Sequence, residues 1–281
     1  MRRILGCSVL IAALFASRAS AQQRPLVTED PETIGSGLVL VEGGIDYDRD
    51  IFYPVSGLTG NRLRLPTLGV SFGVSSIAEI QIDGGIYQRL TVTDREDAPR
   101  SSTLDFSGDQ TSSIDDLVIG TKVRLAPETA GRPAMGIRFA TRLPTASTDS
   151  GLGLGTTDFF TSFLIGKTVQ SIRVVGNVGI ASLANPVEGD PHTEALTYGL
   201  SLARAVRQGV EVVGEVNGRA DLRDGTPPPG TESRGAFRFG ARITHGTVRI
   251  DGGVIIGMTA RDPSVGFTGG FTWVFRGFTV P

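Results

Sequence analysis

The chain has 281 residues, of which 40% are hydrophobic, and a formal net charge of −2. With 27 basic against 29 acidic residues it lacks the positive field that nucleic-acid binding requires, so we expect no nucleic-acid partner. A single cysteine and two histidines exclude a Cys/His metal cluster, and we expect neither a metal site nor a cofactor.

Residues 1–21 have the pattern of a secretory signal peptide. Two arginines precede the apolar run Leu5–Phe15, and Ala19-Ser20-Ala21 is a small-x-small cleavage site. The apolar run is too short to cross a bilayer as a helix. Cleavage after Ala21 would remove Cys7, the one cysteine, and would leave 24 basic against 29 acidic residues.

Residues 22–36 are polar, contain two prolines and are predicted to form an irregular periplasmic lead-in to the first strand. Within this segment Thr28, Glu29, Asp30 and Glu32 are candidates for a plug or periplasmic gate. The alternative is a strand lead-in whose acidic residues cap backbone amides or pair with arginines of a barrel interior. The sequence leaves both interpretations open.

From residue 37 to 281, alternating apolar and polar residues predict about twelve strands of roughly ten residues each. That length suits a tilted strand crossing a bilayer. The 38 glycines make a helical chain improbable. The predicted strands cover residues 39–47, 68–72, 79–89, 117–125, 135–143, 159–165, 172–180, 196–203, 210–219, 237–243, 248–258 and 267–276.

Long and short connections alternate between these strands. Short turns are predicted at residues 75–76, 127–133, 170–171, 207–209 and 245–246. Long loops are predicted at residues 48–61, 91–113, 144–155, 184–193 and 221–234. Outer-membrane barrels have short periplasmic turns and long extracellular loops in this order, and an even strand number places both termini in the periplasm.

The polar face of the predicted strands is charged in mid-strand, which favours a barrel with a polar lumen over a soluble β-sandwich. Two interpretations of these charges are open: a salt-bridge lattice that stabilises the wall, or a polar pathway that selects a solute. The candidate lumen charges are Glu79, Asp83, Lys122, Arg124, Arg138, Arg142, Glu211, Glu215, Arg219, Arg238, Arg242, Arg249 and Asp251.

The last predicted strand places Phe267, Phe271, Trp273 and Phe275 on one face. In a membrane barrel this row would face lipid, with Trp273 in the interfacial aromatic girdle. The strand must then pair with residues 38–47, because a closed barrel leaves no sheet edge.

No catalytic constellation stands out, and we expect that the protein is not an enzyme. His192 lies beside Asp190 in a predicted loop, with Ser182 nearby, but no Gly-x-Ser-x-Gly elbow is present. A histidine in a loop is more often solvated than catalytic.

Several short motifs resemble a known family. They are Arg24-Pro25-Leu26-Val27-Thr28-Glu29-Asp30-Pro31-Glu32-Thr33-Ile34, Leu38-Val39-Leu40-Val41-Glu42-Gly43-Gly44, Ile119-Gly120-Thr121-Lys122, Arg138-Phe139-Ala140-Thr141-Arg142-Leu143-Pro144-Thr145, Gly155-Thr156-Thr157-Asp158-Phe159 and Gly176-Asn177-Val178-Gly179. Together they resemble the outer-membrane proteins grouped under the MetA pathway of phenol degradation, often called transporters. The resemblance spans most of the chain after residue 21.

The resemblance implies an outer-membrane β-barrel that takes part in uptake of small aromatic or hydrophobic compounds. It brings no catalytic residues to carry over. It also implies a terminal aromatic residue that the outer-membrane assembly machinery recognises, whereas this sequence has Phe278 three residues before its end.

We therefore expect an all-β chain that forms a closed antiparallel transmembrane barrel of about twelve strands in the outer membrane of a Gram-negative bacterium. Its expected partners are the lipid bilayer, the assembly machinery and a small hydrophobic solute. The leading function is a channel or transporter. A structural or adhesive barrel without transport, and a soluble periplasmic ligand-binding β-sandwich, are the alternatives.

Overall fold

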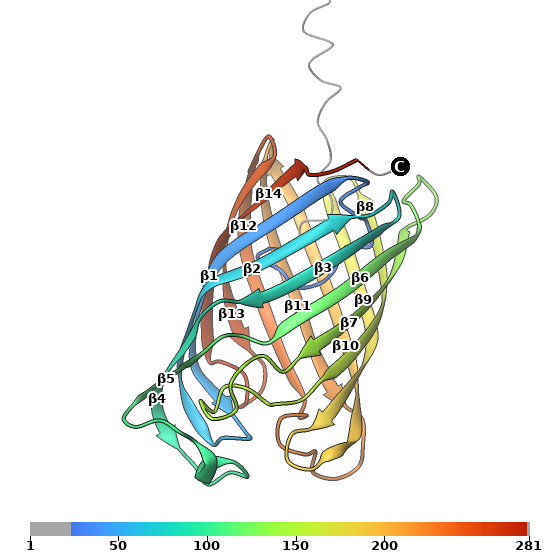
Figure 1. Ribbon diagram of the computed structural model, residues 1–281. Coiled ribbons are helices and arrows are strands. Elements are labelled where there is room, and N and C mark those ends of the chain that lie inside the picture. The colour runs from blue at the N-terminus through green and yellow to red at the C-terminus, as the bar shows by residue number, and fades with distance from the viewer. Residues whose placement is uncertain (1–23, 280–281) are drawn as a thin grey trace, which may run out of the picture.

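The computed structural model describes residues 24–279 and is built from β-strands around a single lumen (Figure 1). The expected signal peptide lies outside the described residues. Twelve strands form the wall: β1 (Leu38–Tyr53), β2 (Leu58–Gly73), β3 (Ala78–Gly85), β6 (Leu117–Ala126), β7 (Ala134–Leu143), β8 (Asp158–Val169), β9 (Ile172–Asn185), β10 (Gly189–Arg207), β11 (Val210–Asp221), β12 (Arg234–His245), β13 (Val248–Gly257) and β14 (Val265–Arg276).

The wall closes because β1 pairs antiparallel with β2 on one side and with β14 on the other. The β1–β14 ladder runs from Leu38 opposite Arg276 to Arg49 opposite Val265. Every other wall strand pairs with its neighbour in the order of the chain. The predicted closed antiparallel barrel of twelve strands is confirmed, and the β-sandwich alternative is wrong, because a sandwich would leave the first and last strands unpaired with each other.

Side-chain burial is reversed relative to a soluble protein. On β14, Phe271 and Trp273 are each 45% exposed, whereas Thr272 between them has no exposed surface. On β1, Ile45 is 43% exposed and the adjacent Asp46 only 7%. Apolar side chains thus form the outer surface and polar side chains the interior. Such an outer surface is stable when lipid covers it.

The two ends of the barrel differ. Connections of two to seven residues join the strands at the end where β1 begins and β14 ends, here the turn end (Figure 1). At the other end, here the loop end, the connections after β7 and β11 are longer. Within residues 24–279 no helix is long and apolar enough to cross a membrane.

Three predicted loops are wrong in part, because strands extend beyond the wall at the loop end. Residues 48–61 are mostly strand, since β1 continues to Tyr53 and β2 starts at Leu58. Residues 184–193 hold a tight hairpin with Gly189 opposite Asn185. Residues 91–113 contain much of β4 (Gln88–Arg95), the short helix η2 (Ser101–Thr103) and β5 (Gln110–Ser113).

The predicted strand 79–89 is in fact two strands. Its first part, β3, pairs with residues 67–73 of β2, and β4 pairs with residues 58–64 of the same strand. Pro66 lies where β2 changes partner, which fits a residue that cannot donate to a ladder. The projecting hairpins have their own apolar core, made of Ile51, Leu58, Leu90, Val92 and Leu152.

Candidate functional site

The lead-in segment, defined here as residues 24–36, lies inside the barrel and contacts opposite walls. Arg24 donates hydrogen bonds to Thr268 Oγ1 and Gly269 O on β14, both at 3.0 Å. The backbone N–H groups of Val27 and Thr28 donate to the carboxylate of Glu215 on β11, each at 2.9 Å. The segment is therefore fixed to the barrel interior along its first residues.

The three acidic plug candidates each contact a cation of the wall. Glu29 lies 3.3 Å from Lys122 and 3.0 Å from Arg138. Asp30 accepts two hydrogen bonds from Arg173, at 2.9 and 2.7 Å, and Glu32 lies 2.6 Å from Arg124. The acidic residues thus pair with basic residues of the barrel interior, which is what the lead-in interpretation describes. The same segment also lies within the lumen, which is what the plug interpretation describes.

Wall side chains also bind the backbone of the lead-in segment, which has no strand partner of its own. The Asn177 amide, oriented to satisfy its neighbours, accepts from Glu29 N at 2.9 Å and donates to Glu29 O at 3.0 Å. Glu79 accepts from Ile34 N at 2.8 Å. Buried backbone groups require such partners, so lumen residues replace the ladder that the segment lacks.

Lys122 is central to this arrangement. It has no exposed surface and lies 3.0 Å from Glu79 in addition to its contact with Glu29. Gln81 donates to both of these glutamates, at 3.0 Å to Glu79 and 3.3 Å to Glu29. The buried charges are therefore paired and hydrogen-bonded, as burial demands.

The other lumen candidates lie on the inner face, and most form ion pairs with wall residues or with Arg24. Arg142 pairs with Asp158 and lies 3.8 Å from Asp116. The remaining pairs are Asp83 with Arg138 at 3.9 Å, Glu211 with Arg242 at 2.7 Å and with Arg249 at 3.7 Å, Glu215 with Arg238 at 3.4 Å, and Asp251 with Arg24 at 3.5 Å. Arg219 instead donates to carbonyl oxygens of the loop after β11.

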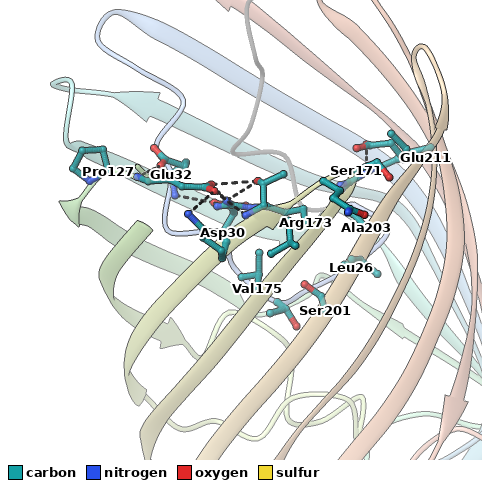
Figure 2. A pocket seen from close by; sticks show the side chains of 18 of the residues that line it. Leu26, Asp30, Glu32, Pro127, Ser171, Arg173, Val175, Ser201, Ala203 and Glu211 are labelled. Carbon is teal, nitrogen blue, oxygen red and sulfur yellow. Dashed lines mark hydrogen bonds and ion pairs between the residues drawn. The ribbon is translucent and has the colours of Figure 1, made fainter. Parts of the chain in front are cut away.

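At the turn end Arg173 holds the lead-in segment. Its contacts with Asp30 and Glu128 are called the clasp here. This guanidinium contacts Glu128 at 2.5 Å as well as Asp30 (Figure 2). Burial acts to raise the pKa of Glu128, but hydrogen bonds from Thr168 and the charge of Arg173 outweigh it and hold that pKa below its ordinary value. Glu128 is therefore ionised at neutral pH and pairs with the Arg173 guanidinium.

Cavities lie on both sides of the lead-in segment. A cavity of about 1160 Å³ opens toward the turn end and is lined by Leu26, Asp30 and Glu32 together with wall residues (Figure 2). Two cavities of about 550 and 440 Å³ lie on the loop-end side, and Val27 and Glu29 line both. The segment thus separates the lumen into compartments.

Loops cover the lumen at its loop end. Ser56 Oγ donates to Gly151 O at 2.8 Å, which joins the β1–β2 hairpin to the loop after β7. Arg100 donates to the carbonyl oxygens of Leu154 and Pro186. Val55, at the tip of the β1–β2 hairpin, is only 3% exposed. Among the described residues no group of three or more His, Cys, Asp or Glu side chains is arranged to hold a metal ion.

Sequence reasoning missed several interior residues of this site. Arg173 and Asp158 face the lumen, but an apolar neighbour on the same face of each strand obscured their role. Arg64 pairs with Asp46 at 2.6 Å and Asp115 at 2.9 Å, and it lies between the predicted loop 48–61 and the predicted strand 68–72, outside both. Alternation of apolar and polar residues along β1 is enough to identify Asp46 as a lumen residue, because it lies on the polar face of that strand.

The fold is shared with solved outer-membrane barrels. The structure of an outer membrane channel from Pseudomonas putida F1 superimposes with a TM-score of 0.61 at 12% identity, covering 88% of this chain and 98% of that chain. The NanC porin has a TM-score of 0.49 at 9% identity, over 84% and 98% of the two chains. The translocator domain of the autotransporter NalP from Neisseria meningitidis has a TM-score of 0.45 at 10% identity, over 86% and 89%.

No family model matches the sequence, and no curated protein matches it. At these identities the likeness to solved structures is one of fold. A closed barrel of twelve strands with an apolar outer surface belongs in an outer membrane, where lipid covers that surface and the closed wall has no unpaired edge strand.

Proposed function

We propose that the protein is an outer-membrane channel whose lumen is closed at rest by the lead-in segment, which acts as a plug. The observation that carries this proposal is the position of residues 24–36 between cavities, attached by ion pairs from Glu29, Asp30 and Glu32 to strands β6, β7 and β9. Side chains and not a β-ladder attach the segment, so in this proposal the plug leaves while the wall keeps its hydrogen bonds, and water replaces the polar contacts of the plug.

The proposed cargo is a small aromatic or hydrophobic compound, and the proposed role is transport rather than catalysis. The sequence resemblance to the outer-membrane proteins of the phenol-degradation group supports this cargo. The similar fold of a protein described as an outer membrane channel is consistent with transport. In this proposal the lumen charges both hold the plug and line the route.

Uptake into proteoliposomes tests the proposal. The intact protein and a variant that lacks residues 24–34 are reconstituted, and entry of radiolabelled phenol and glycerol is compared with protein-free vesicles. We expect slow entry with the intact protein and faster entry with the deletion variant. Heat-modifiable migration on a gel confirms that both barrels are folded.

A structural or adhesive barrel is the second candidate. Its support is the number of ion pairs across the lumen and the loops that cover the loop end. If neither the intact protein nor the deletion variant admits solute faster than protein-free vesicles, the channel proposal fails and this candidate takes its place.

A further inference from the structure

Two arginines face each other directly across the β11–β12 ladder. Arg219 and Arg234 are register partners, and both lie on the lumen face near the loop end. Like charges directly opposite in an antiparallel pair are destabilising. The repulsion is relieved if an anion lies between them.

Neither arginine forms an ion pair with any residue of the described part of the chain. Arg219 donates to Gly230 O at 2.7 Å and Glu232 O at 2.9 Å, and Arg234 donates to Phe52 O at 3.1 Å. Arg234 Nε is buried without a hydrogen-bond partner. Other lumen arginines such as Arg138 have carboxylate partners. Arg219 and Arg234 differ from them because some of their N–H groups remain available to donate to a ligand.

The cavity of about 440 Å³ lies against both side chains. Three arginines line it, Arg138, Arg219 and Arg234, against one carboxylate, Glu29. Glu29 already contacts Lys122 and Arg138, so the cavity carries excess positive charge. By contrast, basic and acidic side chains are equal in number around the 550 Å³ cavity.

The same cavity has an apolar wall. Phe160 lines it and packs against a buried cluster of Ala181, Leu183 and Ala195. A ring lying against Phe160 would bury apolar surface on a rigid support. The cavity therefore combines an aromatic surface with two guanidinium groups, those of Arg219 and Arg234, that form no ion pair within the described residues.

We propose that this cavity is a binding site for a small aromatic carboxylate, whose carboxylate accepts hydrogen bonds from Arg219 and Arg234 while its ring packs against Phe160. Guanidinium groups bind carboxylates with strong charge-assisted hydrogen bonds. A neutral aromatic compound of the same size leaves the two arginines unpaired, so the site selects the acid. That the bound acid is cargo rests on the proposed channel function.

Calorimetric titration of the full-length protein in detergent tests the site with benzoate and, as the neutral probe, benzyl alcohol. We expect benzoate to bind about tenfold more tightly or better, the ratio that one charged hydrogen bond provides. Arg234→Gln and Arg219→Gln should each weaken benzoate binding by about tenfold and leave benzyl alcohol unchanged. Arg223→Gln, in the exposed loop outside the cavity, should change neither.

Equal affinity for the two probes would overturn the proposal, and so would benzoate binding that both cavity variants retain in full. Because binding is measured without transport, the two proposals fail separately. Benzoate binding without uptake by vesicles removes the channel and keeps the site, whereas uptake without benzoate binding removes the site and keeps the channel.

Discussion

At the scale of single residues, Lys122 connects the lead-in segment to the wall. Its ammonium lies between Glu29 of the segment and Glu79 of β3 and has no exposed surface. Removing one member of a buried ion pair leaves an uncompensated charge, at a cost of about 3–5 kcal/mol. Here two carboxylates would remain close together.

We therefore expect Lys122→Met to lower the urea midpoint of unfolding in detergent. The chain has one tryptophan, Trp273, whose fluorescence reports on the closing strand. Arg223→Gln is the matched control, because its side chain is 44% exposed and an exposed pair contributes little. Equal midpoints for Lys122→Met and the unmodified protein would show that the buried pair is dispensable.

Arg173→Gln tests the clasp on the plug. The two hydrogen bonds from Arg173 to Asp30 are charge-assisted, and their loss should raise the open probability in planar bilayers by about tenfold. Lys167→Gln is the control, since Lys167 lies in the same cavity and contacts Glu128 and turn carbonyl oxygens. The clasp has no role in closure if both variants open as rarely as the intact protein.

At the scale of the elements, the outer rows of the strands are expected to contact lipid. Phe271 lies near the middle of β14, whereas Val248 begins β13 beside a turn. An arginine on the lipid face costs about 2–4 kcal/mol at mid-membrane and about 0–1 kcal/mol near the interface. Phe271→Arg should therefore fold into lipid vesicles much less efficiently than Val248→Arg, as judged by heat-modifiable migration. Similar yields of folded protein for the two variants would argue against a position of Phe271 near the middle of the membrane.

The strands could be predicted from the sequence wherever one face meets lipid, because lipid enforces strict alternation. Ile80, Ile82 and Phe239 lie outside as predicted. The extensions at the loop end could not be predicted, since beyond the bilayer both faces of a hairpin accept polar residues. Asp48, which begins the predicted loop 48–61, forms an ion pair at 2.7 Å with Arg62, which directly follows that loop.

The inward direction of the candidate charges followed from the same alternation, but their partners did not. Glu215 binds two backbone amides of the lead-in segment, a contact between residues nearly two hundred positions apart. The segment has no ladder, so no register links Asp30 to Arg173 in the sequence. Only the folded structure shows which basic residue each plug candidate contacts.

At the scale of the whole molecule, the barrel is a closed wall with its lumen divided. The β1–β14 ladder closes the wall, the lead-in segment occupies the interior, and loops meet over the loop end. In the proposed channel, transport requires the plug to move while the wall keeps its hydrogen bonds. The central claim is that the plug, and not the wall, controls passage.

Reversible locking of the plug tests that claim most directly. Leu26 shares a buried apolar cluster with Ala203 of β10, so the double variant Leu26→Cys/Ala203→Cys places one thiol on the plug and one on the wall for oxidation to a disulfide. Single-channel conductance is recorded in the oxidised state and after reduction, with each single-cysteine variant as control. The account predicts no opening steps while the disulfide is intact and opening steps after reduction. Opening steps of equal size and frequency in both states would contradict it.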